Sequence, residues 1–161
     1  MGPKSLFRLL GIYLVGAGFN VSADTVVYTL ENLILTDDTQ MTGSFTWTFD
    51  PGAFENGVGQ FTSLVIPHTA HDHTDLNVSF DIKKSIEISL PGSFHDDGVD
   101  IMLLLEIPLT PTIAAPIKGP ESSYDIGGNS FYVGQFKSGV ITPENFVDDV
   151  LFRNGFEQQA P

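Results

Sequence analysis

Three of the chain's four histidines lie within six positions of each other, in the segment PHTAHDHTD at residues 67–75. In an extended segment, successive side chains point to opposite faces, so His71, His73 and Asp75 would share one face at spacings of about 7 Å. Two imidazoles and a carboxylate arranged in this way can converge on zinc. His68 falls on the other face and joins only if the loop curls. The segment completes no known zinc signature, so a solvated polar loop is the alternative interpretation.

A second polar segment, HDDGVD at residues 95–100, places three carboxylates around a glycine. Such oxygens can bind calcium, although the spacing is not that of an EF-hand. The alternative is a tight turn that leads into an apolar strand. If the two segments meet, His95 and Asp97 would complete a site begun by His71 and His73. The candidate ligands for zinc or calcium are therefore His71, His73, Asp75, His95 and Asp97.

Other chemistry has less support in the sequence. The chain has no cysteine and no GxSxG motif, and the pair Ser122-Ser123 has no histidine near it in sequence. Gly127-Gly128-Asn129 is typical of a turn and does not match a phosphate-binding loop. These features make an enzyme the less favoured class of protein, with a small metal-dependent hydrolase built on His71, His73 and Asp75 as the alternative.

Aromatic residues offer a third possibility, which is sugar binding. Trp47, Tyr124, Phe131 and Tyr132 could form a platform on which a sugar ring stacks. The alternation around Trp47 predicts instead that its side chain points into the core. Tyr124 and Tyr132 remain the candidates for a polysaccharide-binding module.

The first 23 residues have the pattern of a signal peptide. Lys4 and Arg8 precede an apolar run from Leu9 to Phe19, and Val21-Ser22-Ala23 supplies small residues before a cleavage site at Asp24. Eleven apolar residues are too few to span a bilayer, which takes about 20. We therefore expect a secreted protein, located in the periplasm, at the cell surface or outside the cell, with no transmembrane segment after cleavage.

Composition limits the partners of the processed chain. Removal of residues 1–23 leaves five Lys and Arg against twenty Asp and Glu, a net charge of −15. This charge repels nucleic acids and acidic membrane surfaces. Divalent cations, extracellular polysaccharide and other surface components are the better candidates. The 138 remaining residues are enough for one domain with a substantial core, which must be stable without disulfides.

Period-two alternation dominates the processed chain and predicts an all-β fold. In residues 44–49, Phe45, Trp47 and Phe49 alternate with Ser and Thr. The parity changes near Glu31-Asn32, which predicts a bulge, and residues 36–39 predict a hairpin turn. We expect seven to nine strands in one antiparallel β-sandwich, jelly-roll-like, over residues 24–143; a closed barrel is the alternative.

Three details of this pattern lead to separate expectations. The apolar residues of 76–82 and of 86–90 all fall at even-numbered positions, on both sides of Lys83-Lys84-Ser85. This pattern fits either a hairpin whose loop is one residue longer than two residues or a single bent strand. Residues 101–105 are all apolar, at odd-numbered and even-numbered positions alike, which predicts a central strand covered on both faces. Residues 130–141 supply one or two closing strands.

The C-terminal residues 144–161 have a different pattern. Thr142-Pro143-Glu144 is typical of a helix start, and Phe146, Val147, Val150 and Leu151 follow at helical spacing. A short C-terminal helix, a final strand and a loose tail are the alternatives.

Several stretches resemble a group of small exported β-rich proteins of Gram-negative bacteria, many of which carry a PEP-CTERM sorting tail. The stretches are YTLENLILTDDTQMTGSFTWTFDPG, DIMLLLEIPLTP and SSYDIGGNSFYVGQFKSGVITP. The resemblance implies an all-β exported domain and assigns no catalytic residue. In place of the PEP tail, the chain has DDVLFRNGFE, which resembles a short ending of other secreted bacterial proteins and implies a sorting or attachment signal.

Together these observations predict an exported, non-enzymatic β-sandwich that acts as an extracellular or cell-surface structural or binding protein. Divalent cations bound by its acidic loops would add to its stability.

Overall fold

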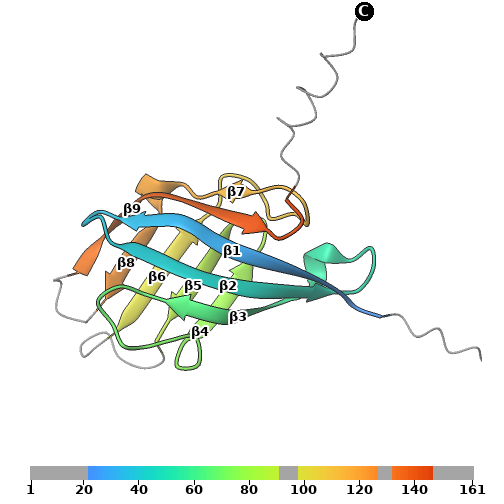
Figure 1. The fold of residues 1–161 in the computed structure, drawn as a ribbon, viewed down its shortest axis with the longest axis horizontal. Coiled ribbons are helices and arrows are strands. Elements are labelled where there is room, and N and C mark those ends of the chain that lie inside the picture. Colours follow the sequence, from blue (N-terminus) through green and yellow to red (C-terminus); the bar gives the residue numbers. More distant parts are fainter. Residues whose placement is uncertain (1–21, 91–97, 127–131, 147–161) are drawn as a thin grey trace, which may run out of the picture.

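The computed structural model of the chain describes residues 22–90, 98–126 and 132–146. Nine strands and two 3-10 turns lie in this part of the chain (Figure 1). The strands are β1 (Asp24–Leu35), β2 (Gln40–Phe49), β3 (Val58–Val65), β4 (Asn77–Asp81), β5 (Ser85–Ser89), β6 (Val99–Leu104), β7 (Ala115–Pro116), β8 (Ser123–Ile126) and β9 (Tyr132–Pro143). The turns are η1 (Phe54–Asn56) and η2 (Gly119–Glu121). The all-β prediction is confirmed.

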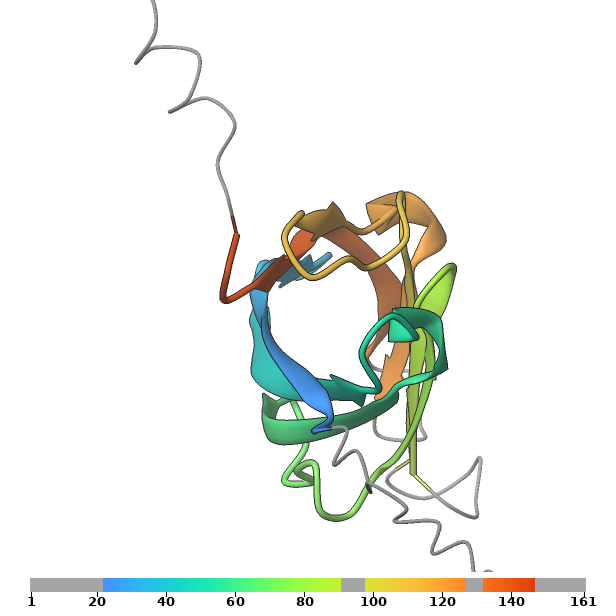
Figure 2. The same ribbon diagram turned by 90° about the vertical axis from the view of Figure 1, so that its right-hand side faces the viewer.

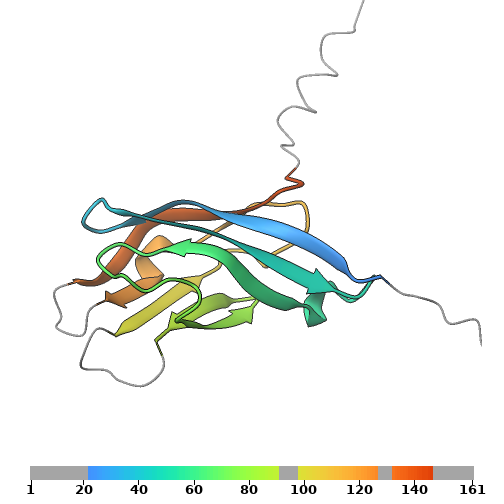
Figure 3. The same ribbon diagram turned by 60° about the horizontal axis from the view of Figure 1, so that its bottom comes forward.

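The strands form one antiparallel sheet in the order β3-β2-β1-β9-β8-β6-β5-β4, and β7 also pairs with β9. β9 joins the two halves of this sheet, because its residues 132–135 pair with β8 and its residues 136–143 pair with β1 and β7. The sheet curls so that β1, β2 and β3 lie across the core from β4, β5 and β6 (Figure 3). Viewed from one end it makes a nearly closed ring (Figure 2). Its shape is therefore closer to the barrel alternative than to two separate layers.

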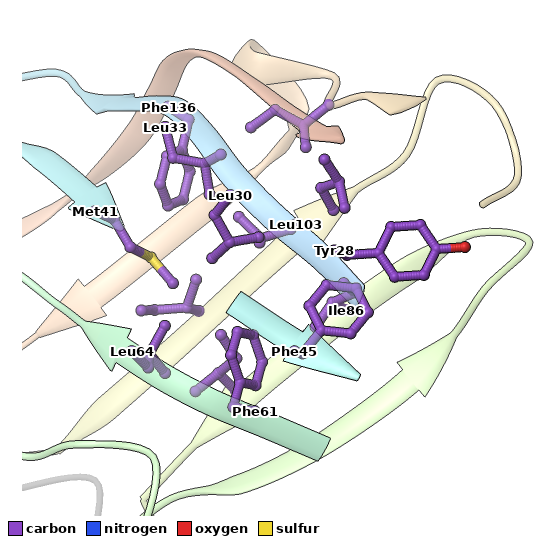
Figure 4. Close-up of a cluster of buried hydrophobic side chains, with 14 of the residues drawn as sticks. Tyr28, Leu30, Leu33, Met41, Phe45, Phe61, Leu64, Ile86, Leu103 and Phe136 are labelled. Atoms are coloured by element: carbon purple, nitrogen blue, oxygen red, sulfur yellow. The ribbon is translucent and has the colours of Figure 1, made fainter. Parts of the chain in front are cut away.

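The ring encloses an apolar core built from the inward side chains of both halves (Figure 4). Phe45 is fully buried, and its ring centroid lies 4.9 Å from that of Tyr28 and 5.0 Å from that of Phe80. Trp47 points inward as predicted, and its indole N–H donates a hydrogen bond to the Phe54 carbonyl (2.8 Å). Dense aromatic packing of this kind stabilises a fold that has no disulfide.

Two local expectations from the sequence are confirmed. The register of β1 against β2 shifts between Leu30 and Leu33, which identifies a bulge, and within it Asn32 has a φ of 52°. Residues 36–39 form the β1–β2 turn, in which the Asp37 carboxylate accepts the N–H of Thr39 (3.0 Å). The bulge restores the inward direction of the apolar side chains in the second half of β1.

β4 and β5 form a hairpin, so the longer-loop alternative is correct. Asp81 pairs with Ser85 across the three residues 82–84, and Phe80 lies opposite Ile86. A three-residue loop places even-numbered residues of β4 opposite even-numbered residues of β5. The apolar side chains of both strands therefore lie on the same face of the hairpin.

The predicted covering of β6 on both faces is only partly correct. Ile101 and Leu103 are buried on the inner face, whereas Met102 and Leu104 are half-buried on the outer face. Met102 lies between its pairing partners Glu87 of β5 and Ser123 of β8, and its outer side remains partly accessible.

At Thr142-Pro143-Glu144, where a helix start was one of the alternatives, the chain continues β9 through Pro143 and then turns at Glu144 and Asn145. Thr142 and Pro143 are the last residues of β9, paired with Thr29 and Tyr28, and the N–H of Glu144 donates to the Val27 carbonyl (2.8 Å). Pairing with β1 overrides the local capping pattern because it satisfies the same backbone groups. Residues 147–161, which hold the rest of the predicted helix, lie outside the described residues.

β1 begins at Asp24, and residues 1–21, which hold most of the predicted signal peptide, also lie outside the described residues. Within the described ranges, none of the helical segments has the length and apolarity needed to cross a membrane.

Candidate functional site

The histidine-rich segment belongs to the connection between β3 and β4, and it is folded into turns. The Asp72 carboxylate accepts hydrogen bonds from the N–H (2.8 Å) and the hydroxyl (2.6 Å) of Thr74. The N–H of Asp75 donates to the Asp72 carbonyl (3.1 Å). The hydroxyl first, and then the N–H, of Thr74 lower the pKa of Asp72. The extended geometry predicted for this segment is therefore wrong.

These turns separate the predicted metal ligands. His71 Nδ1 lies 3.4 Å from Asp75 Oδ2. His73 instead lines a surface hollow together with Phe61 and Val78. Within residues 22–90, 98–126 and 132–146, no three His, Asp or Glu side chains are close enough together to hold a metal ion. His95 and Asp97 lie outside the described residues. A zinc or calcium site on His71 and Asp75 would need a ligand from outside the described part of the chain.

His68, set aside in the sequence analysis, makes the most specific contacts of this segment. Its Nε2 lies 2.6 Å from Asp37 Oδ2, and its ring stacks on Tyr132 at a centroid distance of 3.9 Å and an angle of 4°. His68 has a φ of 66°, an uncommon backbone conformation for a residue other than glycine. We call Asp37, Thr39, His68 and Tyr132 the His68 clip, because they tie the β1–β2 turn and the β3–β4 connection to the start of β9.

The electrostatics of the His68 clip centre on the Asp37 carboxylate. The hydroxyl and then the N–H of Thr39 donate to it and, with His68, hold the pKa of Asp37 at about 2. A carboxylate that receives several hydrogen bonds stays ionised because they stabilise its charged form. The Thr39 hydroxyl lies 3.4 Å from His68 Nε2, but it donates its proton to Asp37 Oδ1 at the shorter distance of 2.6 Å. The contacts of the clip thus fasten three segments of the chain to one another.

The aromatic platform expected for sugar binding does not form from the described candidates. Trp47 is buried, and Tyr124 is only 5% exposed, with its hydroxyl 2.6 Å from Thr36 Oγ1. Tyr132 is 42% exposed, but one face of its ring is occupied by His68. Phe131 lies outside the described residues. Stacking of a sugar on Trp47 or Tyr124 is excluded because neither ring is accessible.

Uncharged polar side chains lie in register across the outer surface of β1, β2 and β3, where the exposed charged residues are Asp24 and Glu31 of β1. Thr29, Ser44 and Ser63 form one row across the strands, and the Ser44 hydroxyl lies 2.8 Å from that of Thr62 and 3.0 Å from that of Ser63. β2 and β3 contain no charged residue. We call this surface the hydroxyl face. Its members are Thr25, Thr29, Thr42, Ser44, Thr46, Thr48, Gln60, Thr62, Ser63 and Thr142.

The outer surface of β4, β5, β6 and β8 has the opposite character. These strands contain Asp81, Glu87, Asp100 and Asp125, all exposed, and no lysine or arginine. We call these four carboxylates the acidic face. Asp100 lies directly opposite Asp125; burial first, and then the Asp125 charge, raise the pKa of Asp100. Glu87 and Asp100 also line a hollow of about 380 Å³.

Comparisons with protein-family models, with curated proteins and with solved structures find no match to this chain. The structure itself shows an antiparallel β protein in which β2 and β3 carry no charge and β4, β5, β6 and β8 carry only acidic charges.

The sequence indicated only part of the hydroxyl face. Ser44, Thr46 and Thr48 alternate clearly with apolar residues in β2, but β3 was not predicted as a strand. Thr62 is an extra residue in β3, because Ser44 pairs with Ser63 while Phe45 pairs with Phe61. This bulge interrupts the alternation that would have revealed the strand.

Proposed function

We propose that this protein is an exported, non-enzymatic binding protein that attaches to neutral extracellular polysaccharide through its hydroxyl face. The observation that carries this proposal is the segregation of charge. The chain has a net charge of −13, yet two adjacent strands, β2 and β3, contain no charged residue.

The chemistry of the hydroxyl face suits such a partner. Each serine or threonine hydroxyl can donate one hydrogen bond and accept two, so hydroxyls that already contact one another keep capacity for a ligand. Thr25 and Thr48, for example, lie 3.2 Å apart on adjacent strands and are both exposed. Polysaccharide hydroxyls have the same dual capacity. Docking them on β2 and β3 would remove water from no charged group. Removing water from a charge is the largest cost of burying polar surface.

The alternatives have less support. A polyanion would be repelled by the net charge of the chain. A metal-dependent hydrolase on His71, His73 and Asp75 would need a further ligand from outside the described residues, because His73 does not join the other two.

Adsorption of the purified protein to insoluble cellulose and chitin tests this proposal, with carboxylated cellulose as the anionic comparison. We expect adsorption to at least one neutral polymer and less to the anionic one. Thr46→Glu places a charge at the centre of the hydroxyl face and should lower the affinity at least about tenfold, or about 1.4 kcal/mol. Ser79→Glu on the exposed part of β4 adds the same charge on the other side and should leave adsorption unchanged.

Two results would contradict the proposal. One is the absence of adsorption to either neutral polymer, and the other is equal adsorption of the wild type and Thr46→Glu. Thermal melts of both variants serve as the check that the substitutions leave the fold intact.

A further inference from the structure

A hollow of about 590 Å³ lies between the β2–β3 connection, the β4–β5 turn and the segment that follows β6. We call it the mouth pocket. Its lining residues are Gly52, Ala53, Phe54, Glu55, Asn56, Ile82, Lys83, Pro108, Leu109 and Thr110. Its volume falls in the range of about 300–1,000 Å³ that is typical of small-molecule sites, and barrel mouths are common locations for such sites.

We propose that the mouth pocket binds one ring of a neutral sugar. This site is separate from the hydroxyl face, because none of its lining residues belongs to that face, and it would bind a soluble sugar independently of the attachment proposed above.

The walls of the pocket are fixed by hydrogen bonds from the core. The Trp47 indole N–H donates to the Phe54 carbonyl (2.8 Å), and the Tyr28 hydroxyl donates to the Thr110 carbonyl (2.8 Å). The N–H of Leu109 donates to the Ile82 carbonyl (2.7 Å), which joins the second wall to the third. Because buried side chains hold the walls in place, a ligand would bind with little cost of ordering the protein.

One side of the pocket is apolar. Ile82 and Leu109 are buried beneath it, and Phe54 is half-buried, with its ring held at 80° to that of Phe49 at a centroid distance of 4.9 Å. A sugar ring presents one face made largely of C–H groups, and such a face packs favourably against apolar and aromatic side chains.

The polar side of the pocket carries both donors and acceptors, with no net charge. Lys83 Nζ lies 2.5 Å from Glu55 Oε2, and both side chains are well exposed, at 59% and 66%. An exposed ion pair of this kind contributes little to stability, so its two groups can turn to a ligand at low cost. The amide of Asn56 adds one further acceptor and two donors.

These groups define the ligand class. A ligand that satisfies a carboxylate, an ammonium group and an amide must itself both donate and accept hydrogen bonds, which hydroxyls do. A charged ligand would instead leave one member of the Lys83–Glu55 pair facing a like charge. A hydroxyl-bearing ring with an apolar face, which is a neutral sugar, therefore fits the pocket best.

A second hollow extends the site. It has a volume of about 330 Å³, shares Glu55, Asn56, Ile82 and Lys83 with the mouth pocket, and is also lined by Trp47, Gly57, Phe80 and Asp81, so it carries one further carboxylate. The Lys83–Glu55 pair thus borders both hollows, and a second sugar ring could occupy the smaller one. We expect a disaccharide or trisaccharide to bind more tightly than a single sugar.

Titration of the full chain with soluble sugars, followed by ¹H–¹⁵N NMR, tests the proposal. The probes are glucose, N-acetylglucosamine, cellotriose and chitotriose, with glucuronic acid as the charged comparison. We expect saturable shifts of the backbone amides of Glu55, Asn56, Lys83 and Thr110 with at least one neutral probe, and weaker or no shifts with glucuronic acid.

Variants supply the matched control. Lys83→Met and Glu55→Gln should each weaken the binding of the responsive sugar at least tenfold, whereas Lys84→Met should not, because Lys84 is exposed next to Lys83 but lines neither hollow. The proposal is overturned if no neutral probe gives saturable shifts at these amides, or if Lys84→Met weakens binding as much as Lys83→Met.

The same variants separate this site from the hydroxyl face. Lys83→Met should leave adsorption to insoluble polymer unchanged, and Thr46→Glu should leave the soluble-sugar titration unchanged. If Lys83→Met abolished adsorption to the polymer, the two sites would not be separate and this inference would be wrong, even if attachment to polysaccharide itself were correct.

Discussion

The hydroxyl face and the acidic face lie on opposite sides of one shared core and differ in charge. On the first, Ser44, Thr62 and Ser63 place their hydroxyls in contact with each other across β2 and β3. On the second, Asp100 and Asp125 stand directly opposite each other with no basic residue in their strands. The inner faces of both halves are apolar and contribute to one core. Inward positions must therefore be apolar in both halves, because they are buried. Outward positions are exposed to solvent, so their charge can differ between the two faces.

The distribution of charge between the two faces also affects stability. Like charges directly opposite each other on antiparallel strands are destabilising, whereas hydroxyl pairs in the same arrangement are favourable. The acidic face therefore costs folding free energy that the hydroxyl face does not. Carboxylates are thus concentrated on one side, while β2 and β3 on the other side carry no charge although the chain is strongly acidic.

Substitutions on the two sides of β2 should give the largest contrast in stability. Phe45→Ala removes a fully buried ring and should lower the free energy of unfolding by about 3–5 kcal/mol. Thr46→Ala, the next residue, which faces outward, should change it by less than about 0.5 kcal/mol. Urea unfolding followed by circular dichroism measures both. Similar losses for the two variants would show that Phe45 does not belong to a shared core.

On the acidic face, removal of one carboxylate should stabilise the protein. Asp125→Asn relieves the repulsion of Asp100 and should raise the free energy of unfolding by roughly 0.2–1 kcal/mol, or the melting temperature by about 1–3 °C. The pKa of Asp100, measured by NMR, should fall toward its ordinary value, because one of the two causes that raise it is gone.

Glu106→Gln is the control for that substitution, because Glu106 is exposed outside the acidic face and the change in net charge is the same. It should give little stabilisation. The gain in Asp125→Asn should also shrink as sodium chloride is added, since salt screens exposed charges. Equal melting temperatures for the two variants would mean that net charge, and not the opposed pair, sets the cost.

The smallest effect should come from the His68 clip in acid. Hydrogen bonds lower the pKa of Asp37 from 3.8 to about 2, so its stabilising contribution is present above 3.8 and is lost as the pH falls through about 2. Asp37→Asn cannot lose a charge. The difference in stability between the wild type and this variant should therefore narrow between these two pH values, as thermal melts would show.

Thr39→Val tests the cause of that behaviour. The Thr39 hydroxyl makes the largest contribution to lowering the pKa of Asp37, so its removal should raise this pKa toward the ordinary value. The loss of stability in acid should then occur at higher pH than in the wild type. If the acid transition were unchanged, the low pKa of Asp37 would result from His68 or from the backbone N–H of Thr39.

Much of the fold could be predicted because alternation is a local property. The alternation of Phe45, Trp47 and Phe49 with hydroxyl residues identified β2 and the inward direction of Trp47. The bulge near Asn32 and the turn at residues 36–39 could be predicted for the same reason. Each depends on residues adjacent in the sequence, and each is found in the structure.

The candidate site was predicted less well, because it depends on contacts between distant residues. The turns that Asp72 forms with Thr74 separate His73 from His71 and Asp75. His68 makes its contacts with residues 31 positions before it and 64 positions after it, which no local spacing could indicate.

The sequence by itself determined the secondary structure class, the inward and outward residues of the clearest strands, and the large excess of negative charge. These depend on the side chains and their order along the chain. Only the tertiary structure decided that one sheet curls into a nearly closed ring, that Thr142 and Pro143 extend β9, and that the neutral side chains of β1, β2 and β3 form one surface. Strand pairing and burial set these features, and both depend on parts of the chain that meet only after folding.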